Sequence, residues 1–204
     1  VLFATGNSGK NIRCGDALVD DKYRVINDAV FGKGPRDKLK MGFNLFKNYG
    51  QGIDGFQITS CQFALHYFFQ NKYTLENFIT NVIECTKLNG YFVGTSYDGN
   101  ILFNMLAKYK KGESKILRDK NDRIMWEITK QYDRDKFNND GSCIGYPIDV
   151  YQESINKTFT EYLVNYNYFN DLMNMYGFVL VSEDDIRIMG LPSSSGLFSE
   201  LFKL

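Results

Sequence analysis

Hydrophobic and polar positions recur along the chain with the spacing of short helices and strands. The clearest case is residues 74–88, where apolar side chains fall on one face of a helix. These side chains are Leu75, Phe78, Ile79, Val82 and Ile83. Thr74 is a suitable residue to cap the start of this helix, and Asn89-Gly90 supplies a left-handed stop after its end. The pattern therefore predicts a helix from about Thr74 to Leu88.

Other segments give a coarser prediction. Apolar periodicity predicts helices over residues 38–49, 100–108 and 167–176. Short apolar or alternating runs predict strands over residues 1–5, 55–60, 91–96, 123–129, 144–151, 159–164 and 178–182. Polar composition predicts mostly loop over residues 10–35 and 110–122, and an acidic turn after residue 182. Residues 196–202 form a further apolar, helix-like stretch.

The order of these elements indicates the fold class. A strand, a helix, a strand and a helix follow one another between residues 55 and 108. This alternation is typical of a parallel sheet flanked by helices, so we predict an α/β fold. We expect the strands at 123–129 and 144–151 to pair as a hairpin outside that sheet. No repeat or low-complexity tract divides the chain, which predicts a single domain.

Charge and composition narrow the possible partners. The 204 residues include 24 Lys and Arg and 24 Asp and Glu, so the net charge is about zero. A large electrostatic footprint on nucleic acid is therefore not expected, but a local contact with one RNA end is compatible with this balance. No apolar run reaches the roughly 18 residues that a membrane span needs, so no membrane partner is expected. The 17 Phe and 14 Tyr suit an aromatic core, with stacking surfaces for bases as the alternative.

Metal-binding and nucleophilic motifs are not found in the sequence. Four widely spaced cysteines and one histidine, His66, do not form the ligand set of a structural zinc site. The cysteine spacing predicts reduced thiols in a cytosol-like compartment. Residues 6–11 do not satisfy the P-loop pattern, and no GxGxxG follows a strand. A catalytic triad would have to combine His66 with Ser60 or Cys61, which lie too near it in sequence to be persuasive.

The segment SCQFALHYFF, residues 60–69, is the most informative feature. It begins at the carboxyl end of a predicted parallel strand, which is the sheet edge where α/β proteins bind ligands. Gln62, His66 and Tyr67 are interleaved there with apolar residues. Taken alone, the pattern leaves two interpretations open: a ligand site, or polar side chains that are partly buried and hydrogen-bonded within the core.

This segment closely resembles the SCQFAxHY-type motif of cap guanine-N7 methyltransferases, including the capping enzymes of large DNA viruses. Three further segments agree with that family in the same order: residues 90–99 (GYFVGTSYDG), residues 160–164 (TEYLV) and residues 176–181 (YGFVLV). The resemblance covers nearly the whole chain. It implies a class I S-adenosylmethionine-dependent methyltransferase with a Rossmann-like sheet.

The resemblance also implies roles for individual residues. On the cofactor side, Asn7 and Ser8 match the turn near the adenine of S-adenosyl-L-methionine, and Gln62 and Tyr67 match residues that line its site. The family usually has Asp at the position of Asn7, so a charged contact there is not implied for this chain. The residues matched to the cap guanine site are His66, Tyr67, Tyr97, Asp98 and Glu161.

The chemistry of N7 methylation is compatible with this residue set. Guanine N7 has a free lone pair and can attack the sulfonium methyl group without losing a proton, so no general base, metal or covalent nucleophile is needed. Catalysis can then come from proximity and orientation. Glu161 can accept hydrogen bonds from guanine N1–H and the N2 amino group, which distinguishes guanine from adenine.

The expected partners are the capped 5′ end of RNA and the other capping domains, a triphosphatase and a guanylyltransferase, upstream in the same chain or as subunits. The expected location is cytoplasmic, in a viral factory or virion, or nuclear for a cellular protein. A non-catalytic binding or stimulatory subunit of a capping complex is the alternative function. A small-molecule methyltransferase of similar fold is disfavoured by Glu161 together with His66 and Tyr67.

By comparison with the family, residues 1–204 are expected to be a partial methyltransferase domain. The sequence aligns from the third strand onward, so the first two strands and the last strand of the family sheet are expected outside it. The expected gap would leave backbone groups unpaired. We therefore predict that this stretch alone neither folds stably nor methylates.

Overall fold

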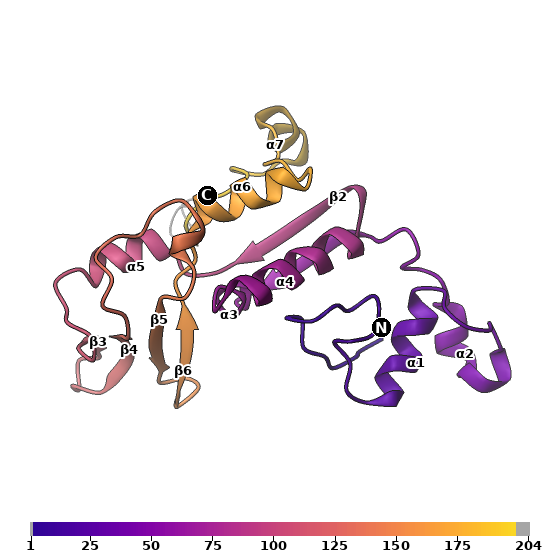
Figure 1. The fold of residues 1–204 in the computed structure, drawn as a ribbon, viewed down its shortest axis with the longest axis horizontal. Helices are drawn as coiled ribbons and strands as arrows, with labels where there is room; N and C mark the ends of the chain where they lie inside the picture. The colour runs from indigo at the N-terminus through magenta and orange to yellow at the C-terminus, as the bar shows by residue number, and fades with distance from the viewer. Residues whose placement is uncertain (1, 199–204) are drawn as a thin grey trace. The chain divides into compact units, whose positions relative to one another are not determined.

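The computed structural model describes residues 2–198 and divides into two compact units, Val1–Tyr166 and Asn167–Leu204 (Figure 1). The helices and strands of the first unit are α1 (Asp21–Val30), α2 (Lys38–Lys47), β1 (Phe56–Gln62), α3 (Leu65–Phe68), α4 (Lys72–Cys85), β2 (Thr86–Thr95), α5 (Gly99–Met105), β3 (Ser114–Arg118), β4 (Ile124–Lys130), the 3-10 helix η1 (Gly141–Cys143), β5 (Pro147–Gln152) and β6 (Lys157–Tyr162). Helix α6 (Tyr166–Met175) starts at the boundary, and α7 (Glu183–Met189) belongs to the second unit.

Strands β1 and β2 pair in parallel, which confirms the predicted α/β unit. Their register runs from Ile58 opposite Tyr91 to Gln62 opposite Thr95. Helix α4 connects the two strands and packs against both of them, and Figure 1 shows it alongside β2. Because the strands are parallel, their carboxyl ends meet at one edge, at Gln62 and Thr95.

Helix α4 begins two residues earlier than predicted. The side chain of Asn71 accepts a hydrogen bond from the Thr74 amide at 3.0 Å, so Asn71 is the N-cap and the prediction of Thr74 was wrong. Thr74 instead lies in the first turn, where its hydroxyl donates to the carbonyl of Phe68 at 2.9 Å. Asn89 does adopt the left-handed conformation, with φ of 62°, but it lies inside β2 at an irregularity in the pairing.

A second sheet is antiparallel, with the strand order β3-β4-β5-β6. The predicted pairing of the strands now seen as β4 and β5 is confirmed, although residues 131–146 separate them and no tight hairpin forms. The prediction of a loop over residues 110–122 was wrong for residues 114–118, because β3 lies there and pairs with β4. β3 is a mostly exposed edge strand, so its pairing partner rather than a buried face determines its conformation.

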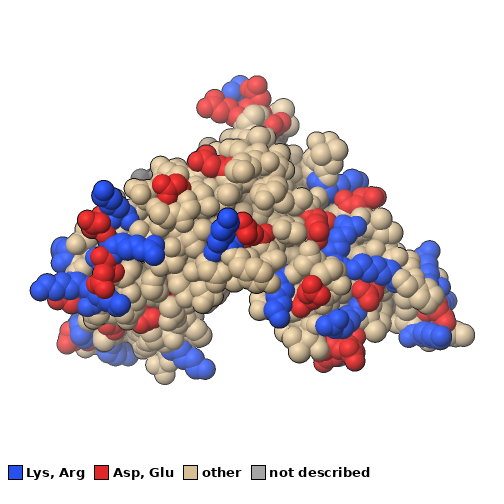
Figure 2. Space-filling model, viewed as in Figure 1, with Lys and Arg blue, Asp and Glu red and all other residues tan. Residues whose placement is uncertain are grey.

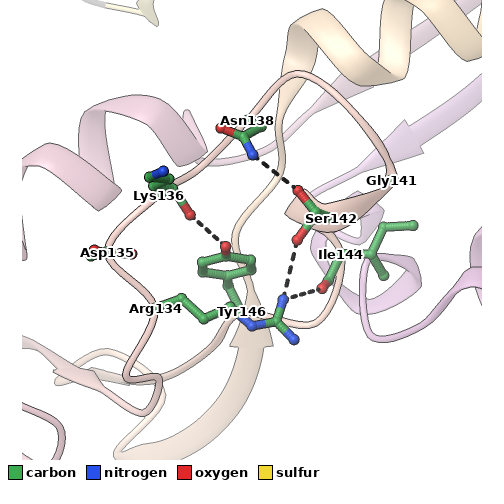
Figure 3. Close-up of a pocket in the computed structure, with 8 residues that line it drawn as sticks. All are labelled: Arg134, Asp135, Lys136, Asn138, Gly141, Ser142, Ile144 and Tyr146. Atoms are coloured by element: carbon green, nitrogen blue, oxygen red, sulfur yellow. Dashed lines mark hydrogen bonds between the residues drawn. The ribbon is translucent and has the colours of Figure 1, made fainter.

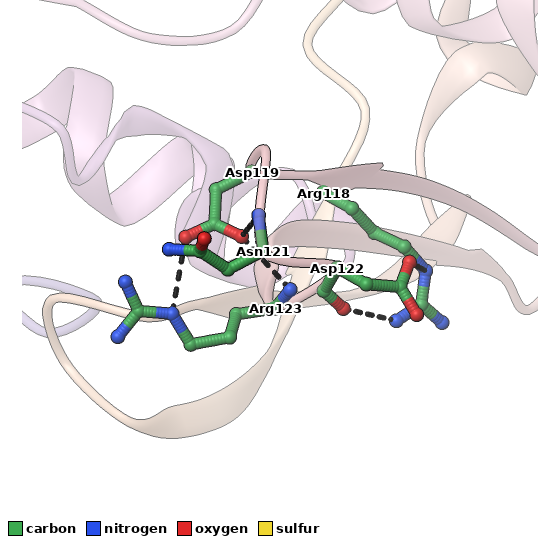
Figure 4. A network of polar contacts seen from close by, with 5 residues as sticks. All are labelled: Arg118, Asp119, Asn121, Asp122 and Arg123. Atoms are coloured by element: carbon green, nitrogen blue, oxygen red, sulfur yellow. Dashed lines mark hydrogen bonds and ion pairs between the residues drawn. The ribbon is translucent and has the colours of Figure 1, made fainter.

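The β3–β4 turn explains how this exposed strand is held in register (Figure 4). One carboxylate oxygen of Asp119 accepts hydrogen bonds from the amides of Asn121 and Arg123. The other accepts from Arg123 Nε at 3.0 Å. These hydrogen bonds, with that of the Arg123 amide first, lower the pKa of Asp119. Asp122 takes the left-handed conformation that closes the turn, with φ of 64°.

Helix α5 and the antiparallel sheet enclose a hydrophobic core of the first unit. Its buried residues are Leu102, Leu106, Ile128, Tyr132, Tyr146, Ile148, Val150 and Leu163. Asp98 starts α5 by accepting hydrogen bonds from the amides of Asn100 and Ile101. Gly99 follows it, and a Cβ there would lie 2.3 Å from the carbonyl oxygen of Val164, so only glycine fits.

The amino-terminal residues differ from the prediction. Residues 2–5 form no strand, and α1 lies within the segment predicted as mostly loop. Apolar periodicity does not predict helix α1, because its sequence, DKYRVINDAV, is largely polar and the helix buries only Asn27 and Ala29. Asp20 caps it by accepting from the Lys22 amide at 2.7 Å, which is a local signal that apolar periodicity does not include.

The second unit also differs in part. The predicted helix at 167–176 is confirmed as α6, but the described residues 178–182 form no strand. The predicted acidic turn is instead α7, where Ser182 is the N-cap and the acidic first turn complements the helix dipole. The apolar stretch at 196–202 lies partly outside the described residues.

Charged side chains of both signs are interspersed on the face shown in Figure 2, in agreement with the zero net charge. Among the helices of the described residues, none combines the length and the apolar character that crossing a membrane requires.

The packing of this core leads to a prediction about how side chains in and after α5 contribute to its stability. Leu106, which directly follows α5, is fully buried, whereas Ile101 within α5 is 50% exposed. We expect Leu106→Ala to lower the free energy of opening of this core by about 2–5 kcal/mol, because it removes buried methyl groups and leaves a cavity. We expect Ile101→Ala to change it far less. Hydrogen exchange of the β4 and β5 amides, in protein expressed from its complete reading frame, measures both, and equal effects would contradict this core assignment.

Candidate functional site

The carboxyl ends of β1 and β2 are joined by side-chain hydrogen bonds. Thr95 Oγ1 donates to Gln62 Oε1 at 2.9 Å, and Gln62 Nε2 donates to Ser60 Oγ at 2.9 Å. The amide of Phe63 donates back to the Thr95 carbonyl at 3.0 Å, and Phe63 adopts a left-handed conformation with φ of 49°. The chain therefore turns sharply at this edge, and the amide group of Gln62 is fixed there.

The short helix α3 follows this turn and orients the two aromatic residues of the motif. Leu65 is buried within α3 and Phe69 directly after it, and together they anchor the helix. His66 is 5% exposed, whereas Tyr67 is 43% exposed. Their rings meet edge to face, with centroids 4.3 Å apart. The structure thus separates the two side chains that the sequence places together, with one buried and one open to solvent.

Glu161 comes from a distant part of the sequence to meet His66. It lies on β6 opposite Ile148 and is 7% exposed. One of its carboxylate oxygens, Oε1, is 3.6 Å from His66 Nε2. That separation is longer than a normal hydrogen bond, so the two side chains are neighbours without fully satisfying each other. The contact joins the parallel unit to the antiparallel sheet.

Several buried polar atoms at this place have no hydrogen-bond partner. They are His66 Nδ1, His66 Nε2, Glu161 Oε2 and Ser96 Oγ. Ser96 directly follows the carboxyl end of β2, and no pattern in the sequence marks it as a site residue. Two further unpaired atoms, Asn27 Nδ2 and Tyr132 Oη, are in other parts of the first unit. Buried polar groups are normally paired, so a concentration of unpaired ones indicates where a ligand would supply the partners.

Burial opposes the charge on both members of the pair. It raises the pKa of Glu161 to about 7 and lowers the pKa of His66 to about 4. Burial first, and then the nearby Glu161, also raise the pKa of Tyr67. His66 is therefore neutral at physiological pH, and its contact with Glu161 is not an ion pair between two full charges.

Tyr97 and Asp98 lie beyond the end of β2 and make structural contacts. The hydroxyl of Tyr97 accepts hydrogen bonds from Gln152 Nε2 at 2.8 Å and from Trp126 Nε1 at 3.4 Å. Asp98 caps α5. Both side chains therefore contact α5 or the antiparallel sheet. The helix cap is a sufficient reason for Asp98 at this position, and a role in ligand binding stays a prediction for both residues.

Asn7 and Ser8 lie in a turn near the start of α4. Asn7 Oδ1 accepts a hydrogen bond from the Gly9 amide at 2.9 Å, which closes the turn. A Cβ on Gly9 would be 3.6 Å from the side chain of Thr74 in the first turn of α4. Because α4 starts soon after the carboxyl end of β1, this turn lies toward the same edge of the parallel strands as Gln62.

A hollow of about 420 Å³ lies in a different place, in the loop before β5 (Figure 3). The Arg134 guanidinium donates to the carbonyls of Ser142 and Ile144 and lies 4.8 Å from the ring centre of Tyr146. Its positive group is thus used within the loop, and the hollow contains none of the residues predicted for the site. No group of three or more His, Cys, Asp or Glu side chains suited to a metal occurs in the described part of the chain.

A strand–helix–strand unit with polar and unpaired groups at its carboxyl edge defines the chain as an α/β protein, a class in which ligand sites lie at that edge. The chain matches, over residues 43–188, the family described as the mRNA (guanine-N(7))-methyltransferase domain, and it belongs to that family. This family has the class I S-adenosylmethionine-dependent methyltransferase fold, which confirms the predicted fold class.

A viral relative agrees with this assignment. The chain is 33% identical over 173 residues to a probable mRNA-capping enzyme of Acanthamoeba polyphaga mimivirus. The alignment covers 79% of this chain and 14% of that relative, so the chain spans about one seventh of its length. The family match includes Gln62, His66, Tyr67 and Glu161, whereas Asn7 and Ser8 precede it.

The raised pKa of Glu161 leads to a prediction about stability. Below pH 4.5 the side chain is protonated in both folded and unfolded states, and its burial costs nothing extra. Between pH 4.5 and about 7 only the unfolded state loses the proton, so stability falls as pH rises, by up to roughly 3 kcal/mol. We expect Glu161→Gln to remove this loss.

Melting curves at pH 5 and pH 8 measure the effect in protein expressed from its complete reading frame. The stabilisation by Glu161→Gln relative to the unmodified protein should be larger at pH 8. His66 is present in both proteins, so its own titration largely cancels from the comparison. A difference that stays constant with pH would show that Glu161 ionises freely in the folded state.

Proposed function

We propose that this chain transfers a methyl group from S-adenosyl-L-methionine to N7 of the guanine cap of mRNA. The observation that carries the proposal is the buried pair of His66 and Glu161, whose unpaired atoms lie near the carboxyl ends of β1 and β2 in a chain of this family. The pair provides a carboxyl group, which can accept hydrogen bonds, and a neutral imidazole, and both are shielded from solvent. This combination suits a planar base with adjacent N–H donors.

Glu161 is the residue that recognises guanine in this proposal. As a carboxylate it accepts hydrogen bonds from the guanine N1–H and the N2 amino group, and Oε2, which has no partner in the structure, becomes paired. Adenine has no N–H donor at N1 and no 2-amino group, so it would leave the buried carboxylate unsatisfied. The specificity for guanine follows from that difference.

His66 and Tyr67 shape the space between the base and the methyl donor. The buried His66 packs beside the purine, and the half-exposed ring of Tyr67 is free to cover the purine or the cofactor. N7 carries its own lone pair, so neither side chain has to remove a proton. Their contribution is to hold N7 in line with the methyl carbon and its leaving sulfur. We propose that Tyr97 and Asp98 border the same pocket.

The residues proposed to hold the cofactor are Asn7, Ser8, Gln62 and Tyr67. They fit a polar nucleoside because the fixed amide of Gln62 and the turn at Asn7 lie toward one edge, and Ser96 Oγ provides an unpaired hydroxyl there. When bound, S-adenosyl-L-methionine supplies an activated methyl group on a sulfonium. Gln62 and the turn would orient it, and the apolar surroundings of His66 would exclude water.

The proposed substrate is the capped 5′ end of RNA, and the proposed partners are the triphosphatase and guanylyltransferase that produce it. The mimivirus relative is a probable mRNA-capping enzyme, which supports both assignments. A cytoplasmic place of action stays a prediction. A non-catalytic stimulatory subunit and a small-molecule methyltransferase are outcomes that the experiment below distinguishes.

Methyl transfer from labelled S-adenosylmethionine to GpppRNA, in protein expressed from its complete reading frame, tests the proposal. We expect Glu161→Ala to lower kcat/KM by about 10²–10³-fold, because two charge-assisted hydrogen bonds are lost. We expect His66→Ala to lower it by about 10²-fold through misplacement of the base. Glu153→Ala, on the exposed turn after β5, is the matched control and should retain full activity.

A folded protein that binds the cofactor but never methylates the cap would refute the proposal. Methylation of a small molecule alone would point to the third function, and stimulation of a separate methyltransferase would point to the binding subunit.

Cap affinity should also depend on pH. Only ionised Glu161 accepts both guanine donors, so affinity for a cap analogue should fall about tenfold per pH unit below about 7 and level off above it. The neighbouring His66, with its pKa of about 4, and Tyr67, with its raised pKa, do not titrate between pH 6 and 8.5. Titrations of a cap analogue over that range measure the profile, and Glu161→Gln should bind weakly at every pH. An unchanged profile in that variant would assign the dependence to another group.

A further inference from the structure

This inference rests on the proposed function and concerns the turn that carries Asn7 and Ser8. The turn belongs to a segment, residues 6–18, that contains no helix or strand. Hydrogen bonds within the segment close the turn locally, from the Lys10 amide to the Asn7 carbonyl at 2.9 Å and from the Asn7 amide to the Ala17 carbonyl at 2.8 Å. The position of the segment on the rest of the unit depends in addition on contacts made from outside it. Those contacts come mainly from one face of α4.

Asn81 makes the central contacts. It lies on α4, is 4% exposed and uses its whole side-chain amide on this segment. Asn81 Oδ1 accepts from the amide of Ile12 at 2.8 Å. Asn81 Nδ2 donates to the carbonyls of Ser8 and Lys10, each at 2.8 Å. One buried side chain thus fixes three alternate backbone positions, much as a neighbouring strand would.

A second attachment lies one turn further along α4. Asn11 Nδ2 donates to Glu84 Oε2 at 2.8 Å, and Arg13 Nη1 donates to the Glu84 carbonyl at 2.7 Å. At the other end, Gly9 lies against Thr74 in the first turn of α4. The segment therefore runs along the helix, and its tip at Asn7–Gly9 is aimed toward the carboxyl edge of β1 and β2.

We infer that Asn81 is a positioning residue for cofactor binding. It touches neither substrate in the proposed arrangement and acts through the backbone of Ser8, Lys10 and Ile12. By fixing these groups it holds the Asn7–Gly9 turn at a position along α4 from which the turn can contact the adenosine part of S-adenosylmethionine. The turn itself is exposed at Asn7, so without Asn81 it would be held less firmly along α4, and ordering it on the ligand would cost affinity.

Calorimetric titrations of S-adenosylmethionine and of a cap analogue test this role in protein expressed from its complete reading frame. We expect Asn81→Ala to weaken cofactor binding at least tenfold and to change cap-analogue binding less than twofold. Asn77→Ala is the matched control, because Asn77 lies one turn earlier on α4 and its side chain donates only to the Tyr73 carbonyl of the same helix. It should leave both affinities unchanged.

Asn81→Asp separates positioning from simple filling of space. Aspartate has the same shape and keeps the acceptor for Ile12, but it sets an oxygen against the carbonyl oxygens of Ser8 and Lys10. We expect it to weaken cofactor binding at least as much as alanine does. Aspartate with normal cofactor affinity would overturn the inference, because a side chain that only fills space would tolerate this exchange.

Folding and function are checked separately. Hydrogen exchange should become faster at Ile12 and its neighbours in Asn81→Ala while the β1 and β2 amides stay protected. Should that variant fail to fold, Asn11→Ala, which removes the hydrogen bond to the Glu84 carboxylate, should weaken cofactor binding in the same direction but less. If the unmodified protein methylates the cap and the Asn81 variants keep full cofactor affinity, the inference about Asn81 is refuted and the proposed function stands. If the unmodified protein does not methylate the cap, the proposed function itself is refuted.

Discussion

The parallel pairing of β1 with β2 is the constraint on which the rest of the first unit depends. It brings Gln62 and Thr95 together at one edge, and the turn at Phe63 then sends the chain directly into α3. Without this pairing there would be no common edge for His66 and Ser96. The antiparallel sheet contributes Glu161 to that edge, so two sheets of different topology meet at the proposed cap site.

The proposed cap site is costly for the folded protein. Burial moves the pKa of Glu161 up and that of His66 down, so each side chain resists the charge that would make their contact a strong ion pair. A pair of apolar residues of similar volume would pack there without unpaired atoms. The chain retains instead a carboxyl group and an imidazole that a base with suitable donors can satisfy. A lower stability of the folded state is expected where binding has to discriminate between two purines.

Much of this arrangement could be predicted from the sequence, and the exceptions have physical reasons. Helices with a buried apolar face, such as α4, were predicted because their apolar residues recur with the spacing of one helical face. The edge strand β3 and the polar helix α1 were missed because pairing and a capping aspartate, rather than an apolar face, define them. Residues 178–182 have a strand-like composition, but none of the described residues pairs with them.

The candidate site was predicted by resemblance more than by pattern. His66 and Glu161 are far apart in sequence, and their contact depends on how α3 meets β6, which no local spacing encodes. Ser96 and Asn81 were missed for a similar reason. A serine at a strand end and an asparagine within a helix are ordinary until the structure shows that one has no partner and the other binds three backbone groups.

The connection between α3 and α4 unites these parts. In the proposed arrangement α3 carries the cap side of the site, and α4 holds the turn on the cofactor side. Only residues 69–71 separate the two helices, and the Thr74 hydroxyl fixes them by donating to the Phe68 carbonyl. In-line transfer requires N7 and the methyl carbon to be aligned within a fraction of an ångström. In the proposed arrangement, the short connection between the two helices would set the cap side relative to the cofactor side without any group that takes part in the chemistry. The segment from Gln62 to Phe69 would then serve to position these two sides as well as to line the site.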